Sequence, residues 1–198
     1  MCELDETFPS TYEVEEVGDF PGNGEFREPI YYFPRLKNAR EHTGSWLKIK
    51  SSSENSWIGV FALEYQVPPA ISRVLTTPVA SRLCVISAGM GHIVTASNPD
   101  VYEQIPIFPI LDVRAVKDKG LLIFSDFIRL AAYSRDSLIW KSPRVCWDDL
   151  KITNISDDII EGVGYDPTSS EQTRFAVDLL TGRLLSSAAK SAAGESIW

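Results

Sequence analysis

Two tryptophans and two basic residues lie within one short segment of the chain. Trp140 and Trp147 flank this segment, and Lys141 and Arg144 lie between them. Aromatic rings and arginine supply much of the contact energy at protein interfaces. The four residues therefore predict a binding site for a protein partner. The competing interpretation, which the usual burial of large rings favours, is that both rings cap the ends of the sheet core.

Carboxylates follow this segment at Asp148, Asp157 and Asp166. Such residues could bind a divalent cation or act as an acid pair in glycoside hydrolysis. Their spacing does not match the calcium loop, which needs acids at alternate positions and a closing glutamate. Solvated turn positions explain them more simply. We expect no metal and no cofactor, and a small carboxylate- or metal-dependent hydrolase is the alternative function.

Nucleophilic catalysis requires a nucleophile, a base and an orienting acid. The chain has two histidines, His42 and His92, and no Gly-x-Ser-x-Gly motif. Cys84 and His92 flank a predicted turn and could form a Cys/His pair. A cysteine among apolar residues is, however, typical of a core. The sequence identifies no catalytic residue, and it favours a protein that is not an enzyme.

β-Strands are the elements that would position these residues. Residues 47–50 alternate apolar with basic side chains, 51–55 are polar, and 56–67 read as a returning strand, so this stretch predicts a hairpin. Residues 82–97 predict a second hairpin, whose turn contains two glycines.

A short helix is expected between these hairpins and the last third of the chain. Pro99 follows Ser97 and Asn98, either of which could cap a helix, and Pro106 and Pro109 would end it. We therefore predict one or two helical turns within residues 98–109.

From Gly120 to Ser187 two strand-rich segments follow one another, at 121–140 and 150–187. A repeat at about 40 residues is typical of repeated β-meanders. The predicted fold class is mainly β, with consecutive antiparallel hairpins that form a twisted sheet, a sandwich or an incomplete propeller-like array.

Residues 175–187, FAVDLLTGRLLSS, carry a motif found in a known repeat. Ala176, Asp178, Thr181 and Gly182 match the pattern Ala-x-Asp-x-x-Thr-Gly, and Ser186 stands where that pattern has a tryptophan. The segment resembles β-propeller repeats of the quinoprotein-dehydrogenase type.

The resemblance implies a sheet geometry in which the aspartate and glycine turn the chain between two strands, and it implies no catalytic residue. It implies no quinone either, because a closed propeller needs at least about four blades and this chain could supply about two or three. The earlier segment provides a tryptophan, Trp140, but its turn at 134–136 lacks Thr-Gly.

The length and the local composition of the chain predict three parts: an arm, a domain and a tail. The chain has 198 residues, enough for one substantial core. Residues 1–28 are acidic and rich in turn formers, and predict a loosely ordered arm with aromatic residues. Residues 29–187 predict a single β-rich domain, and 188–198 a flexible tail.

The formal charge of −8 disfavours nucleic acid and anionic membranes as partners, because both attract basic surfaces. The first ten residues lack the features of a signal peptide, and no apolar run is long enough to span a membrane. Three cysteines without metal-type spacing favour a reducing compartment. We expect a soluble, cytoplasmic, non-catalytic interaction protein that binds a basic protein partner, and the sequence leaves its oligomeric state open.

Overall fold

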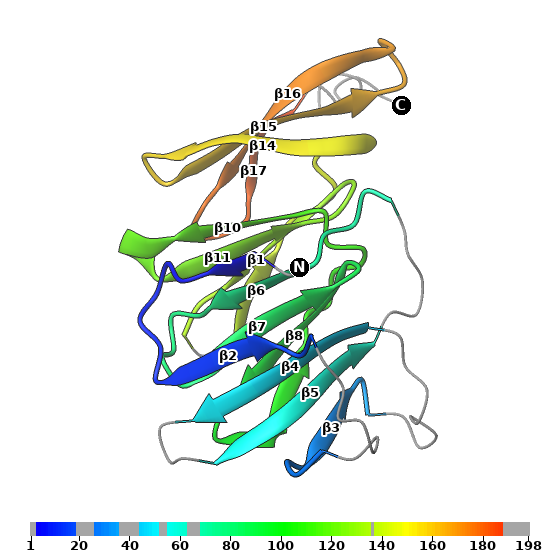
Figure 1. Cartoon of the computed structure of the whole chain (residues 1–198). Helices are drawn as coiled ribbons and strands as arrows, with labels where there is room; N and C mark the ends of the chain where they lie inside the picture. Colours follow the sequence, from blue (N-terminus) through cyan, green and yellow to red (C-terminus); the bar gives the residue numbers. More distant parts are fainter. Residues whose placement is uncertain are drawn as a thin grey trace. The chain divides into compact units, whose positions relative to one another are not determined.

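The computed structural model describes residues 3–18, 26–35, 44–51, 55–62, 68–135 and 137–187. Almost all regular structure in these ranges is β-strand, so the predicted mainly β fold is confirmed (Figure 1). The chain divides into two compact units, Met1–Ile110 and Leu111–Trp198.

The first unit contains two sheets. In sheet A, four consecutive strands form an antiparallel meander, and β1 adds to it parallel to β6; its order is β1 (Glu3–Asp5), β6 (Arg73–Thr76), β7 (Arg82–Ser87), β8 (Met90–Thr95) and β9 (Asn98–Gln104). Sheet B has the order β2 (Tyr12–Glu16), β4 (Gly44–Ser51), β5 (Ser56–Ala62) and β3 (Ile30–Phe33). The two hairpins predicted from the sequence are β4–β5 and β7–β8, which are confirmed.

Apolar side chains of sheets A and B form one core. Sheet B contributes Leu47, Ile49 and Phe61, and sheet A contributes Leu83 and Val85, all of them buried. These alternate positions lie on one face of each strand, because side chains of a strand point to opposite faces in turn. The unit is therefore a two-layer arrangement of sheets.

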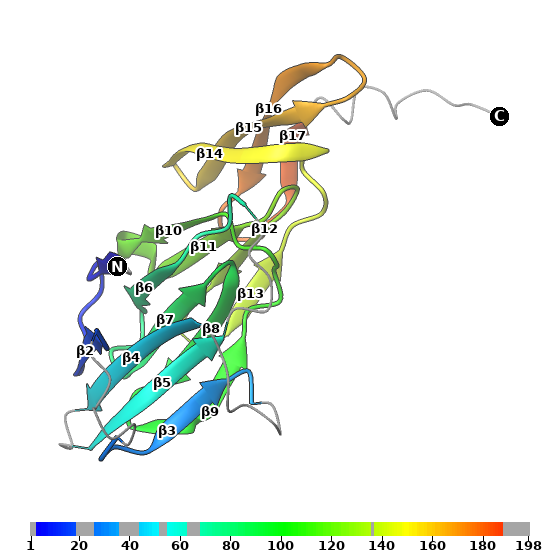
Figure 2. The same ribbon diagram turned by 45° about the vertical axis from the view of Figure 1, so that its right-hand side comes forward.

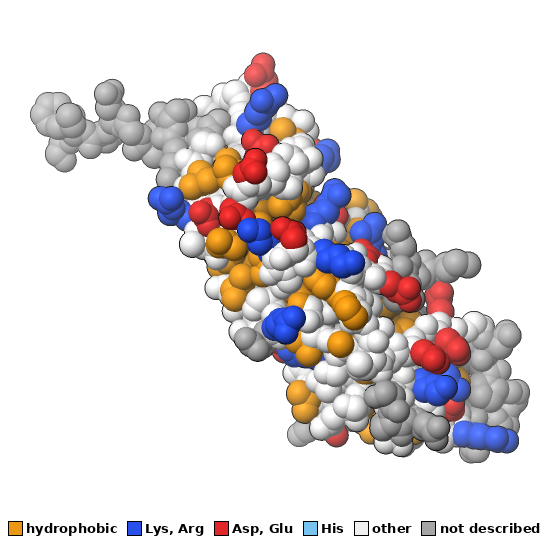
Figure 3. Space-filling model, turned by 90° about the vertical axis from the view of Figure 1, so that its left-hand side faces the viewer, with side chains coloured by type: hydrophobic (Ala, Val, Ile, Leu, Met, Phe, Trp, Pro, Cys, Tyr) orange, Lys and Arg blue, Asp and Glu red, His pale blue; other side chains and the backbone are white. Residues whose placement is uncertain are grey.

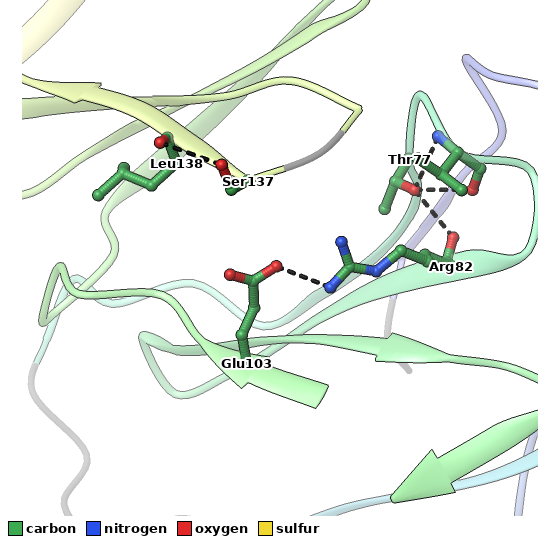
Figure 4. Close-up of polar contacts among 6 residues, drawn as sticks. Thr77, Arg82, Glu103, Ser137 and Leu138 are labelled. Carbon is green, nitrogen blue, oxygen red and sulfur yellow. Dashed lines mark hydrogen bonds and ion pairs between the residues drawn. The ribbon is translucent and has the colours of Figure 1, made fainter. Parts of the chain in front are cut away.

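Sheet A is also tied together by polar groups, drawn in Figure 4. The Arg82 guanidinium lies 2.7 Å from the Glu103 carboxylate, which joins β7 to β9 across β8. The Thr77 hydroxyl donates to the Arg82 carbonyl at 3.0 Å.

The prediction of a short helix within residues 98–109 is wrong, because residues 98–104 form the strand β9. Proline is tolerated on an edge strand, and β9 is the last strand of sheet A, so Pro99 does not prevent pairing. The Tyr102 ring packs edge-on against Phe33 at 5.1 Å between centroids. This tertiary contact favours the strand over the local helix signal.

The second unit contains two further antiparallel meanders (Figure 2). Sheet C comprises β10 (Asp112–Val116), β11 (Leu121–Ser125), β12 (Leu130–Tyr133) and β13 (Leu138–Lys141), with the 3₁₀ turn η1 (Lys117–Lys119) between the first two strands. Sheet D comprises β14 (Asp148–Ser156), β15 (Ile159–Asp166), β16 (Glu171–Asp178) and β17 (Leu184–Ser187).

Sheets C and D share a second core. Leu121, Ile123 and Leu130 from sheet C pack with Ile160 and Phe175 from sheet D, and all five are buried. Each unit therefore has a core of its own. The predicted repetition of β-meanders is present as successive four-stranded sheets.

The predicted arm, domain and tail remain predictions. Two segments of the arm, Glu3–Asp5 and Tyr12–Glu16, are strands β1 and β2. The tail at 188–198 lies outside the described residues. Among the residues that are described, no helix has the length and apolar character that a membrane crossing requires.

Candidate interaction surface

The segment 142–147 connects β13 to β14 and is held in place by backbone hydrogen bonds. The Ser142 amide donates to the Leu130 carbonyl at 2.8 Å, and the Ser142 hydroxyl accepts from the Leu130 amide at 2.9 Å. The Val145 amide donates to the Ile128 carbonyl at 2.9 Å. The connection therefore follows the edge of sheet C with a fixed backbone.

Burial differs between neighbouring side chains of this connection. Val145 and Cys146 are buried, whereas Arg144 and Trp147 are exposed. Cys146 lies close to β15, where a Cβ on Gly164 would be 2.4 Å from the Cys146 Cβ. Burial raises the pKa of the Cys146 thiol to about 11, so it is uncharged and unreactive at neutral pH. The inward side chains anchor the connection and leave Arg144 and Trp147 at the surface.

Arg144 and Trp147 form a stacked pair. The Arg144 guanidinium lies over the Trp147 ring, 4.7 Å from its centroid. The Trp147 side chain is 49% exposed even so. The Trp147 amide donates to the Tyr165 carbonyl at 3.1 Å, and Tyr165 itself is 38% exposed. We call Arg144, Trp147 and Tyr165 the aromatic surface.

Trp140, by contrast, is part of the core. Only 8% of it is exposed, and its indole Nε1 donates to the Leu179 carbonyl at 2.9 Å. The ring lies against Gly182, where a Cβ would be 2.5 Å from Trp140 Cε3. Gly182 has φ +69°, a conformation that side chains other than that of glycine rarely adopt. Trp140 therefore packs on the turn between β16 and β17.

Asp178 shapes that turn. Its carboxylate accepts from the amides of Leu180 at 3.1 Å and Thr181 at 2.8 Å, and from the Thr181 hydroxyl at 2.8 Å. The hydrogen bonds from Thr181 lower the pKa of Asp178. The Asp-x-x-Thr-Gly residues identified in the sequence thus form a turn. The Trp140 ring of the facing sheet packs against the glycine of this turn.

The four predicted site residues therefore separate into two groups. Arg144 and Trp147 are brought together, Lys141 ends β13 with an exposed side chain, and Trp140 points into the core. Tyr165 was missed by sequence reasoning. It lies at an exposed position of β15, opposite Asp148, and this pairing is known only from the register of β14 and β15.

The carboxylates of the alternative hypothesis are not brought together as a set. Asp148 pairs in register with Tyr165 near one end of the β14–β15 hairpin, and Asp157 lies in the turn at the other end, with φ +49°. Asp166 is buried, and its carboxylate accepts from the Thr168 amide at 2.9 Å. The described residues contain no group of three or more His, Cys, Asp or Glu side chains that could hold a metal ion.

Cys84 and His92 do not form a pair. Residue 85 is opposite His92 in the β7–β8 ladder, and Cys84 is opposite Ile93. Because directly opposite residues share a face, Cys84 and His92 point to opposite faces of sheet A. Burial raises the pKa of the Cys84 thiol and lowers that of His92 to about 4, so both are neutral near pH 7.

A pocket of about 380 Å³ lies elsewhere in the second unit, between the end of β10 with η1 and the middle of β14. Its lining mixes charged side chains such as Arg114, Lys117 and Asp118 with apolar ones. None of the four predicted site residues lines it.

A scan of the sequence against models of known protein families finds no match, and a search of curated proteins finds none. The interpretation of the aromatic surface therefore depends on its geometry.

Proposed function

We propose that the chain is a non-catalytic interaction protein that binds a protein partner through the aromatic surface. The observation that carries this proposal is the half-exposed Trp147 ring under the Arg144 guanidinium. Tryptophan, tyrosine and arginine are the residues most enriched among those that dominate binding energy. Arg144 and Trp147 stack here, and the Trp147 amide donates to the carbonyl of Tyr165.

The backbone of the aromatic surface supports the proposal. Residues 142–147 are fixed by hydrogen bonds to sheet C and to Tyr165. A partner that docks on this segment would not have to order it first, which lowers the entropic cost of binding. An exposed indole on a fixed backbone is therefore suited to act as an anchor.

The charge of the chain favours a basic partner. The net charge of −8 attracts positively charged proteins over distances of several ångströms and raises their association rate. In the face drawn in Figure 3, Lys and Arg side chains are scattered among Asp and Glu and form no single basic patch. This distribution agrees with a protein partner better than with nucleic acid.

We also infer that the sheets are blade-like repeats related to those of quinoprotein dehydrogenases. The contact of Trp140 with Leu179 and Gly182 supports this, because the turn belongs to the segment that carries the resemblance. The buried free thiols of Cys84 and Cys146 agree with a location in the reducing cytoplasm.

The test is affinity capture from cells of the source organism with wild-type chain, Trp147→Ala and Arg144→Ala as bait. A partner recovered by wild type is then purified, and its Kd is measured by calorimetry. We expect Trp147→Ala to weaken binding by at least about tenfold, the effect typical of a dominant interface residue.

Leu180→Ala is the matched control, because Leu180 is exposed to a similar extent, 52%, and lies in the same unit outside the aromatic surface. It should leave the Kd unchanged. Equal recovery of the partner by wild type and Trp147→Ala would refute the proposal.

A further inference from the structure

Strand β2 is an edge of sheet B with part of its backbone unpaired. Among the described residues it pairs only with β4, in the antiparallel direction. The Val17 amide continues this ladder by donating a hydrogen bond to the Trp46 carbonyl at 2.9 Å. In an antiparallel pair, alternate residues exchange hydrogen bonds with the partner strand and the others direct their backbone groups away from it. Because residue 17 bonds to β4, so do Glu15 and Glu13. Tyr12 and Val14 therefore point their amide and carbonyl groups away from β4. The Ser10 hydroxyl already donates to the Tyr12 carbonyl at 3.3 Å, so Val14 is the residue that an added strand would pair with.

Strand β2 is attached to the rest of the first unit by hydrogen bonds and packing. The Thr11 amide donates to the Ala80 carbonyl at 2.8 Å, and the Tyr12 hydroxyl donates to the Arg82 carbonyl at 2.9 Å. Val14 packs against the core of the first unit from its rim. These contacts fix β2 at both its backbone and its side chains, so that an added strand would meet a preformed template.

A pocket of about 250 Å³ runs along this edge. It is lined by residues 12–15 together with Glu6, Ser10 and Thr76, and no basic side chain lines it. Three acidic residues, Glu6, Glu13 and Glu15, thus line the same pocket as Val14. Their charge determines which kind of strand would be accepted.

The side chains of β4 show what such a strand should carry. Lys50 is opposite Glu13, with 3.7 Å between Nζ and the carboxylate, and Lys48 is opposite Glu15. Lys48 is engaged elsewhere, because its Nζ lies 2.6 Å from the Glu28 carboxylate. Opposite charges on directly paired residues stabilise neighbouring strands. The Glu13 carboxylate keeps 72% of its side chain exposed beside Lys50, and the cation opposite Glu15 is bound to Glu28, so both glutamates could accept a further cation from a strand on their other side.

We propose that the β2 edge binds a basic, extended segment of a partner protein as an additional strand of sheet B. Alternate lysines or arginines of that segment pair with Glu13 and Glu15, and its backbone pairs with Val14. Strand addition to an exposed edge is a known mode of peptide recognition, in which the backbone gives affinity and the side chains give specificity. This inference rests on the proposed function, since it adds the contact that would make the partner a basic one.

The test uses an acetylated, amidated peptide with the sequence Lys-Val-Lys-Val-Lys-Val-Lys and the full chain. Its Kd is measured by calorimetry at low and at elevated salt, and amide exchange of Val14 is followed by NMR. We expect saturable binding that weakens with salt, together with at least tenfold slower exchange of the Val14 amide in the complex. A peptide with Glu in place of every Lys should not bind.

Two kinds of variant separate backbone pairing from charge. Val14→Pro removes an amide that does not bond to β4, so sheet B should persist while binding is lost. Glu13→Gln with Glu15→Gln should weaken binding at least tenfold and leave the fold intact, which keeps the test decisive if Val14→Pro fails to fold. Glu161→Gln, on an exposed position of β15, is the matched charge control.

The test of the β2 edge and the test of the aromatic surface have distinguishable outcomes. Trp147→Ala should bind the lysine peptide as wild type does. No binding by wild type, or binding unaffected by Glu13→Gln with Glu15→Gln, would overturn the inference about β2 and leave the proposal for Trp147 standing. Conversely, if a partner binds Trp147→Ala as tightly as wild type while the peptide binds as expected, only the proposal for the aromatic surface is refuted.

Discussion

At the scale of single residues, His92 is the most unusual group in the first unit. It is 1% exposed, and neither ring nitrogen has a hydrogen-bond partner among the described residues. Its neighbours are the rings of Phe33, Phe61 and Tyr102, with centroids 6.0, 6.1 and 6.2 Å away. No charged side chain is among these ring neighbours, so a proton on His92 would be poorly solvated.

This burial predicts a loss of stability in acid. The pKa of His92 falls from its ordinary 6.5 to about 4 in the folded chain. Below pH 6.5 the unfolded chain takes up a proton that the folded chain still excludes. The free energy of unfolding therefore decreases as the pH falls from 6.5 to 4, by about 3 kcal/mol from this residue alone.

Urea unfolding followed between pH 7.5 and 4 checks this expectation. His92→Leu, which keeps an apolar side chain in the same ring environment, should show a clearly shallower decrease than wild type over that range. Parallel decreases in the two proteins would show that another group is responsible.

The two tryptophans of the predicted site show what the sequence can and cannot reveal about single residues. Their types and spacing predicted a binding segment, which stays a prediction; Trp147 stacks with Arg144 and is half-exposed, whereas Trp140 is buried. Nothing in residues 140–147 indicated which ring is buried. Trp140 is buried by a turn that begins 38 residues later, at Asp178.

At the scale of elements, the same contact joins the two sheets in both units. Trp57 of β5 donates its indole N–H to the Ala96 carbonyl at 2.8 Å, in the turn between β8 and β9. Trp140 of β13 donates to Leu179 at 2.9 Å, in the turn between β16 and β17. Each turn precedes the last strand of its sheet. The second unit therefore repeats the first in how a tryptophan docks on the facing sheet.

This docking makes Gly182 sensitive to substitution. Gly182→Ala would place a methyl group 2.5 Å from the Trp140 ring in a backbone conformation with φ +69°. The strain of the backbone and the displaced indole together should lower the free energy of unfolding by about 2 to 4 kcal/mol. Thermal unfolding monitored by near-ultraviolet circular dichroism measures this effect through the tryptophan signal.

Gly18→Ala is the matched control, because a Cβ at Gly18 would have no atom within 4 Å. Its effect should lie within about 0.5 kcal/mol. Similar stabilities of Gly182→Ala and wild type would show that the turn adapts and that the docking of Trp140 adds little.

Sequence patterns predicted the elements where local signals and tertiary contacts agree. The sequence of β4–β5 alternates apolar with basic residues, and that of β7–β8 has two apolar runs around a turn with glycines. Both hairpins are present. The strand at 98–104 was predicted as a helix, since Asn98 and Pro99 are helix-start residues and the edge pairing that tolerates a proline is a tertiary feature. Parallel pairs such as β3 with β5 join segments far apart in sequence, which no local pattern specifies.

At the scale of the whole molecule, two buried apolar clusters each lie within a single compact unit. One buried cluster, with Leu47 and Val85, draws only on residues before 111, and the other, with Ile123 and Phe175, draws only on residues after it. The sequence predicted one domain from 29 to 187 from chain length and composition, and this stays a prediction.

We therefore expect residues 1–110 and 111–198, expressed separately, each to fold cooperatively. A core that belongs to one unit is buried by that unit's own two sheets, and this burial is the main driving force for its folding. Amide exchange should remain slow in β7 and β8 of the first piece and in β15 and β16 of the second, as in the full chain. A piece that shows no protected amides would contradict autonomy, and would support the single domain that the sequence predicted.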